Sequence, residues 1–316
     1  MLKTLASIAL IGFSLNSFAA PAADHGDFLL KHNLVDGPDF FGDSDVKHIP
    51  YDQLMKGLAD LAARYPERAK VVKFGKTILG RDLNVLRIED TSSGHVEPGR
   101  AAVEISGAIH GNEYLGIEDK LAAYFLEHTD KMPGLSLYLA AGGVIYVIPV
   151  INPDGYEALE RGNKNGTDLN RDFDILPTHE NRFTQPETSA LKNFLDQDLT
   201  ASQLKLRFVM DYHCCVPALI TPWTYVDEHP AQKDLAAYNE VIDLQKKLLG
   251  YDAGNAADTV GYLAVGSSLD YFYAKYGTTA FTIEGRYRGE ESKFEKHAEL
   301  FDAVFEKLAI KQLGID

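Results

Sequence analysis

The chain has 316 residues, with 46 acidic and 31 basic side chains, which gives a formal net charge of −15. This balance excludes a nucleic-acid-binding protein, because phosphate binding requires clustered cations. Apolar residues make up 45% of the chain and charged residues 24%, a mixture that excludes intrinsic disorder and can bury a substantial core. The length fits one large domain or two small ones.

The N-terminus has the pattern of a secretory signal peptide. Lys3 precedes an apolar run from Leu5 to Leu15, and the small residues Ser17 and Ala19 follow it. A signal over residues 1–19 predicts a secreted or periplasmic protein. The alternative, a membrane anchor, is disfavoured because a spanning helix takes about 20 apolar residues. Charges or prolines interrupt every later apolar run, so we expect no integral membrane segment after signal removal.

Apolar periodicity after the signal predicts a single α/β domain. Residues 20–48 show little periodicity and are expected to form an extended segment, which leaves 49–316 as the domain. The expected elements, in chain order, are a helix at 51–65, strands at 71–74, 83–88 and 101–106, a helix at 115–126, a strand at 143–150, a helix at 184–195, a strand at 206–212, helices at 235–249 and 267–276, a strand at 279–284 and a final helix at 294–309. The strand at 143–150 is nearly continuous in apolar residues, which is typical of a strand covered on both faces.

A long irregular stretch at 151–183 is rich in Gly, Pro, Asn and Asp. A loop of this length in a compact domain is usually functional. We expect the helix that follows it to begin with a capping box formed by Thr184 and Glu187.

The only two cysteines, Cys214 and Cys215, are adjacent in the sequence. They cannot form the spaced disulfides of small secreted proteins, so stability must come from the core. We expect two small, buried apolar side chains at these positions. The alternative is a vicinal disulfide formed in an oxidising compartment.

Polar residues follow directly after several of the expected strands, where open α/β sheets bind their ligands. His110, Glu113, His213 and Glu284 all occupy such positions. His110 and Glu113 are three residues apart, so one turn can aim an imidazole and a carboxylate at the same point. His213 would complete the His₂Glu set associated with catalytic zinc, which leaves a fourth position open to water. For either histidine alone, a hydrogen-bonded core position is the competing interpretation.

The long loop also contributes Arg161, Asn170 and Arg171. The planar guanidinium group of arginine pairs with a carboxylate through two hydrogen bonds, which lysine cannot do. Two such groups and an amide beside the expected metal indicate a site for an anionic substrate. A surface ion pair is the alternative for any single arginine.

Taken together, these motifs resemble those of zinc carboxypeptidases of the M14 family. The resemblance begins at about Tyr51 and rests on Gly75 to Arg81, His110 to Glu113, Asn152 to Gly155, Arg161, Asp168 to Arg171, Tyr262, Asp270 and Glu284. It implies a single three-layer α/β/α domain with a mixed, largely parallel central sheet. It also implies a monomeric enzyme with one Zn²⁺ per chain that acts on peptide or protein C-termini.

The resemblance assigns a role to each of these polar residues. His110, Glu113 and His213 are the metal ligands, and Glu284 is the general base. Arg161 stabilises the oxyanion. Asn170 and Arg171 hold the free C-terminus of the substrate, and Tyr262 closes over the bound residue; a half-buried loop tyrosine is the alternative for Tyr262.

The sequence departs from the family's digestive members at Asn112, where they carry an arginine. It resembles the regulatory members there, but we expect neither their additional β-sandwich domain nor the folded pro-domain of digestive zymogens. The specificity pocket aligns with Ala264, Leu269 and Thr282. Leu269 is apolar, which favours an apolar or aromatic C-terminal residue, whereas Asp258 near the Tyr262 loop leaves a basic preference open.

Other functions remain open at this point. A murein peptidase that trims cell-wall peptides would need extra cationic groups, for which Arg286 and Arg288 are candidates. A small-acyl amidohydrolase shares the signature at His110 to Glu113 but lacks the arrangement of Tyr262 with Asn170 and Arg171. A catalytically inactive binding protein would lack a ligand or the base, and none is missing.

Overall fold

The computed structural model describes residues 48–174, 182–286 and 289–315. The expected signal at 1–19 and all but the last residue of the segment 20–48 lie outside the described residues. The chain forms an eight-stranded sheet with the strand order β1-β2-β4-β3-β5-β8-β6-β7. The strands are β1 (Ala69–Lys76), β2 (Asp82–Glu89), β3 (Arg100–Gly107), β4 (Val144–Ile148), β5 (Leu204–Cys215), β6 (Ala218–Ile220), β7 (Asp252–Gly254) and β8 (Thr279–Arg286).

The middle of the sheet is parallel and its flanks contain antiparallel pairs. β4, β3, β5 and β8 run parallel to one another, whereas β2 pairs antiparallel with both β1 and β4, and β6 pairs antiparallel with β8. All five residues of β4 are buried, as its continuous apolar sequence predicts. The expectation of an α/β fold with a mixed, largely parallel sheet is confirmed.

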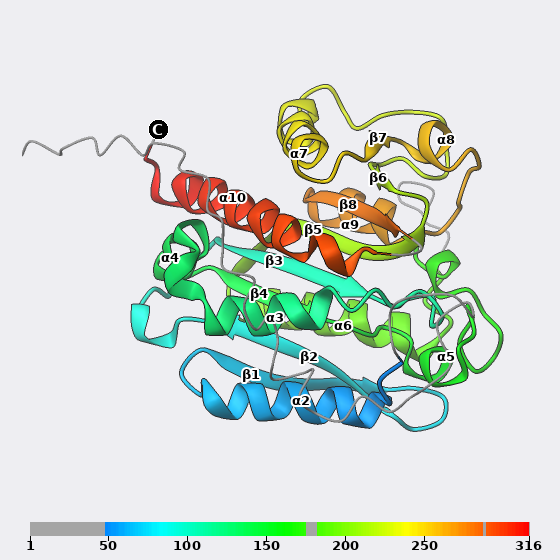
Figure 1. Cartoon of the computed structure of the whole chain (residues 1–316), viewed down its shortest axis with the longest axis horizontal. Helices are drawn as coiled ribbons and strands as arrows, with labels where there is room; N and C mark the ends of the chain where they lie inside the picture. The colour runs from blue at the N-terminus through cyan, green and yellow to red at the C-terminus, as the bar shows by residue number, and fades with distance from the viewer. Residues whose placement is uncertain (1–47, 175–181, 287–288, 316) are drawn as a thin grey trace, which may run out of the picture.

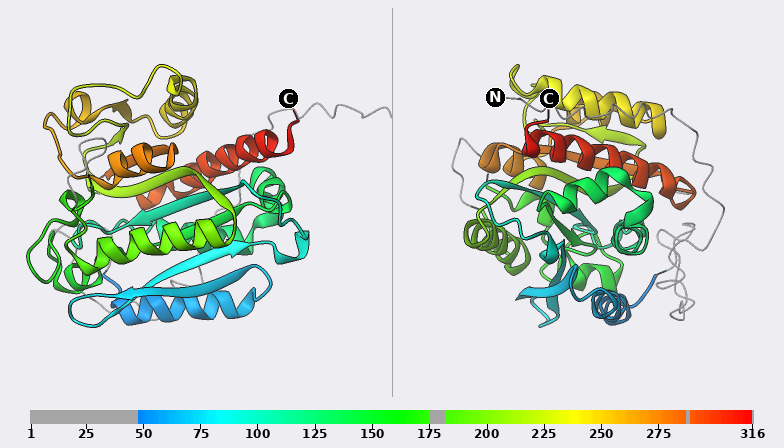
Figure 2. Two further views of the ribbon diagram at one scale, coloured as in Figure 1. Left: turned by 180° about the vertical axis from the view of Figure 1, so that it is seen from behind. Right: turned by 90° about the vertical axis from the view of Figure 1, so that its left-hand side faces the viewer.

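Helices cover both faces of this sheet and complete three layers (Figure 1). Their bounds are α2 (Tyr51–Arg64), α3 (Glu118–Glu127), α4 (Pro133–Ala140), α5 (Pro153–Ala158), α6 (Pro186–Ala201), α7 (Leu235–Leu248), α8 (Ala256–Thr259), α9 (Ser268–Tyr276) and α10 (Phe294–Leu313). Figure 2 shows α3, α4 and α10 on one face and α6 and α9 on the other. Among the described residues, no helix combines the length and apolarity that crossing a membrane requires.

Two helices begin two or more residues after their expected starts. The helix expected from residue 115 begins at Glu118 because Gly116 adopts a left-handed conformation with φ of 67°. The expected capping box at Thr184 is wrong. Its hydroxyl donates to Asp172 at 2.7 Å, and the helix begins two residues later, at Pro186.

Several short elements were not expected. α5 lies inside the stretch expected to be irregular, where the Asn152 side chain caps it by accepting a hydrogen bond from Gly155 N at 2.9 Å. α4, β6 and β7 were also missed. β6 and β7 have three residues each, too few for a periodic apolar pattern to emerge.

The end of β5 departs from expectation in two ways. The strand continues past residue 212 to Cys215, so His213 lies within the strand and not after it. Cys214 and Cys215 form a vicinal disulfide and are half-buried. The preferred expectation of two buried free thiols is therefore wrong: the chain leaves the core here, and the next residues, Val216 and Pro217, are exposed.

Candidate active site

A tight turn after β3 holds His110 and Glu113. Glu113 N donates to His110 O at 3.0 Å and closes the turn. The turn packs directly on the start of α5, where a side chain at Gly111 would place its Cβ 2.1 Å from the Gly155 carbonyl carbon. Glycine is therefore required at position 111. The close packing of the turn on α5 fixes the positions of His110 and Glu113.

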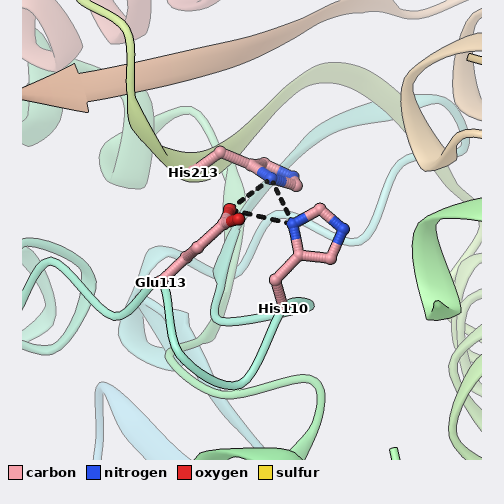
Figure 3. Close-up of side chains that lie close together, drawn as sticks. All are labelled: His110, Glu113 and His213. Carbon is pink, nitrogen blue, oxygen red and sulfur yellow. Dashed lines mark hydrogen bonds and ion pairs between the residues drawn. The ribbon is translucent and has the colours of Figure 1, made fainter. Parts of the chain in front are cut away.

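His213 reaches the same point from β5 (Figure 3). Glu113 Oε2 lies 2.8 Å from His110 Nδ1 and 3.2 Å from His213 Nδ1, and the two Nδ1 atoms are 3.2 Å apart. All three side chains are buried, and their candidate ligand atoms lie within 4.8 Å of one another. Two imidazole nitrogens and one carboxylate converging in this way match the donor set of catalytic zinc sites.

The electrostatics of the cluster favour an ionised Glu113. Burial alone would raise the pKa of this carboxyl, but hydrogen bonds and charge from His110 and His213 outweigh burial and hold it well below its usual value. An ionised carboxylate is the form that binds a divalent cation.

Each histidine is hydrogen-bonded on its far side by a buried or half-buried acid. His110 Nε2 lies 3.1 Å from Asp168 Oδ1, and His213 Nε2 lies 3.1 Å from Asp211 Oδ2. In the neutral form of histidine that binds a metal, such partners fix the imidazole tautomer, so that Nδ1 of both rings presents its lone pair to the centre of the cluster. Asp211 was missed in the sequence, although it shares a strand face with His213, two residues further on.

Glu284 lies beside this cluster, on β8, which continues two residues beyond the expected end of the strand at 284. It is paired in register with His213 on the neighbouring parallel strand. Burial raises the pKa of Glu284 to about 7, against the opposing charge of His213. A carboxyl with a pKa near neutrality is suited to proton transfer.

The guanidinium group of Arg161 contacts the cluster from the long loop. Its Nη1 donates to Glu113 Oε1 at 2.9 Å. Its Nε and Nη2 both lie 3.0 Å from Asp168 Oδ2. Arg161 thus pairs with the candidate ligand Glu113 and with Asp168, the hydrogen-bond partner of His110. The Arg161 side chain is 43% exposed.

Asn170 and Arg171 lie on a short 3₁₀ turn, Leu169–Arg171, which the Asp168 side chain caps by accepting from Asn170 N at 2.9 Å. Ser268 N donates to Asn170 Oδ1 at 2.9 Å. Arg171 Nη1 donates to Asn170 O at 2.7 Å. Asn170 Nδ2 donates to no other described residue, which leaves this donor available to a ligand.

The structure does not bring every expected site residue together. Tyr262 is 51% exposed in the loop between α8 and α9, and within the part of the chain that the structure describes it makes no hydrogen bond to His110, Glu113 or His213. Leu269 is buried in the hydrophobic core at the start of α9. Arg286 is exposed at the end of β8, and Arg288 lies outside the described residues.

The fold and the His-Glu-His cluster define a metallohydrolase of the zinc carboxypeptidase class. The model of the zinc carboxypeptidase family, peptidase family M14, matches residues 54–306, and the chain belongs to this family. The family is zinc-dependent, and the donor set described above fits that metal.

Individual relatives agree with this assignment. The rat carboxypeptidase N catalytic chain is 33% identical over 147 residues, which are 42% of this chain and 32% of the relative. Human carboxypeptidase D is 27% identical over 226 residues, 67% of this chain and 15% of the relative. The chain thus spans a third or less of the length of these proteins. The structure of carboxypeptidase A from Helicoverpa armigera shares the fold, with a TM-score of 0.67 at 19% identity, covering 90% of this chain and 78% of that chain.

Proposed function

We propose that this protein is a zinc-dependent carboxypeptidase that removes the C-terminal residue of peptides or proteins. The convergence of His110, Glu113 and His213 on one point carries this proposal, since it offers three ligands and leaves a coordination position open. Each chain holds one zinc ion in this site. When bound there, zinc supplies Lewis acidity and lowers the pKa of a water molecule to about 7.

Glu284 acts as the general base. It accepts a proton from the attacking water and delivers it to the departing amine. Its pairing with His213 and the pKa of about 7 that burial gives it support this role. Arg161 stabilises the negative charge that develops on the carbonyl oxygen, a contribution of ~3 kcal/mol for one such donor. Its position within 2.9 Å of Glu113 supports this assignment.

Asn170 and Arg171 bind the terminal carboxylate of the substrate, which makes the enzyme an exopeptidase. The Nδ2 group of Asn170 faces away from Ser268, because the amide oxygen accepts the Ser268 N–H. Tyr262 closes over the bound C-terminal residue, and its exposed position in the loop between α8 and α9 supports this role. Leu269 favours an apolar or aromatic residue in the specificity pocket.

A second candidate, a murein peptidase, is favoured by one observation. Arg286 follows Glu284 by two residues on β8, and alternate residues of a strand share a face. Its exposed guanidinium group could bind the additional carboxylate of a cell-wall peptide. Release of a C-terminal residue from a muropeptide, without release from ordinary peptides, would establish this function in place of the first.

We further propose that the catalytic domain covers residues 49–316, and that the protein is exported to the periplasm or the medium and acts as a monomer. The signal pattern at 1–19 supports export. The functional proposal is tested by a panel of peptides that differ only in their last residue, each with a free or an amidated C-terminus. Removal of a single residue from the free acids alone is the expected result; cleavage of both forms at equal rates would contradict it.

A further inference from the structure

A buried carboxylate behind the metal cluster has no role in the function proposed above. Asp211 on β5 is 1% exposed. Its Oδ1 lies 3.0 Å from the Ser106 hydroxyl, and its Oδ2 lies 3.1 Å from His213 Nε2 and 3.0 Å from Ser268 Oγ. A buried acid that meets three donors holds all of them in fixed directions, because leaving any one unsatisfied is costly.

The contact with His213 determines which ring nitrogen can bind a metal. A neutral imidazole carries one N–H, and a carboxylate can only accept, so the proton lies on Nε2 beside Asp211. The lone pair of Nδ1 therefore faces His110 Nδ1 and Glu113 Oε2, each 3.2 Å away. Without Asp211, the ring could carry its proton on Nδ1 and turn it toward the other ligands.

Ser268 connects Asp211 to the substrate-binding turn. Its hydroxyl has one proton and two acceptors within reach, Asp211 Oδ2 at 3.0 Å and Asn170 Oδ1 at 3.3 Å. Asn170 Oδ1 already accepts the Ser268 backbone N–H at 2.9 Å, so the hydroxyl proton goes to the carboxylate. Ser268 thus holds Asp211 with its side chain and Asn170 with its backbone.

The serine is itself rigidly placed. Ser268 is the first residue of α9 and is 1% exposed. Its N–H is one of the helix-initiating donors that no carbonyl of the same helix can satisfy, and Asn170 supplies the acceptor. An unbroken series of hydrogen bonds therefore runs from His213 through Asp211 and Ser268 to Asn170.

We propose that Asp211 and Ser268 are positioning residues that couple the metal ligand His213 to the carboxylate anchor Asn170. Asp211 keeps His213 in the metal-binding tautomer, and Ser268 sets the distance between that ligand and the anchor. This inference rests on the proposed carboxypeptidase function for the role of Asn170, but the part that concerns His213 depends only on metal binding.

The experiment compares Asp211→Asn, Ser268→Ala and the control Ser106→Ala. Ser106 also donates to Asp211 and is also fully buried, but among the described residues its side chain makes no hydrogen bond to His213 or Asn170. The zinc dissociation constant of each purified protein is measured by competition with a chromogenic chelator after metal removal. Thermal unfolding of the metal-free proteins and the kcat and KM for a peptide with a free C-terminus complete the comparison.

We expect Asp211→Asn to weaken zinc binding by about 10- to 100-fold, the effect usual for loss of a partner behind a metal ligand. Ser268→Ala should weaken zinc binding in the same direction but less, because His213 keeps its acceptor. Ser106→Ala should keep the parent's zinc affinity even where it lowers the unfolding temperature. If Asp211→Asn fails to fold, the zinc affinities of Ser268→Ala and Ser106→Ala test the coupling, since only Ser268→Ala should bind zinc more weakly than the parent.

Two outcomes would overturn the coupling. Either the zinc affinities of Asp211→Asn and Ser268→Ala match that of the parent, or all three variants lose zinc affinity in proportion to their loss of stability. Both results would leave Asp211 a structural residue while the parent enzyme remained a carboxypeptidase. A different outcome separates the two proposals. If the parent releases no C-terminal residue but the variants still bind zinc more weakly, the role of Asp211 is upheld and the proposed carboxypeptidase function is rejected.

Discussion

His213 on β5 and Glu284 on β8 occupy directly paired positions in two adjacent parallel strands. Paired residues of neighbouring strands point to the same face of a sheet, and the strands lie about 4.8 Å apart. The spacing between a metal ligand and the proposed base is therefore fixed by strand register, and no flexible loop intervenes between them. This rigidity suits a reaction in which a proton moves between water and a carboxylate.

Glu284→Gln tests the proposed base. The amide keeps the shape of the side chain but cannot accept a proton, so kcat should fall by about 10²- to 10⁴-fold. Zinc content, measured by elemental analysis, should not change, because Glu284 is not one of the three ligands. Glu299→Gln on the exposed side of α10 is the matched control, and an active Glu284→Gln enzyme would reject the assignment.

The pH dependence of kcat/KM follows from the same residue. Burial raises the pKa of Glu284 to about 7 in the metal-free protein, and a nearby bound cation would lower it. The base must be ionised, so activity is present above this pKa and is lost as the pH falls through it. An acid limb with its midpoint at or below about pH 7 is expected; a rate that stays constant down to pH 5 would contradict it.

Arg171→Ala tests the carboxylate anchor. Loss of the guanidinium group removes its hydrogen bonds to the substrate's terminal carboxylate, so KM for free-acid peptides should rise. Amidated peptides, which lack that charge, should be affected much less, and the preference for free acids should shrink. An unchanged preference between the two peptide forms would show that Arg171 does not bind the terminus.

Gly111→Ala should disturb the metal site through packing. The added Cβ would lie 2.1 Å from the Gly155 backbone, so the turn that carries His110 and Glu113 must move, at a cost of about 1–3 kcal/mol in unfolding free energy. Zinc affinity should fall with it. Gly75→Ala is the control: its Cβ would meet Ala190 Cβ at 2.6 Å, between β1 and α6. It should destabilise the protein without weakening zinc binding.

The sequence predicted the elements whose residues repeat in a regular apolar pattern. α2 appears where its apolar periodicity places it, and β4 where its continuous apolar run places it, because long amphipathic or buried segments are determined by their own residues. The candidate ligands were also identified from the sequence, since the spacing of His110 and Glu113 is local and the motifs occur in the family's order.

Features that depend on distant contacts were not predictable in the same way. Asp211 looks like any polar residue in a strand until Ser268 and Ser106 are placed beside it. The hydroxyl of Thr184 binds Asp172 and not the helix it was expected to cap. In both cases the hydrogen-bond partner comes from a segment distant in the sequence or from a loop that folds back, and the local sequence does not show it.

In the proposed enzyme, His110, Glu113 and His213 together hold one zinc ion. The most direct test of this site is the zinc stoichiometry of the purified protein and of His213→Ala. The control is His95→Ala, which changes a half-buried histidine in the segment between β2 and β3. The parent and the control should each contain about one zinc per chain and release C-terminal residues, and His213→Ala should lose both properties. Full zinc content and activity in His213→Ala would contradict the claim.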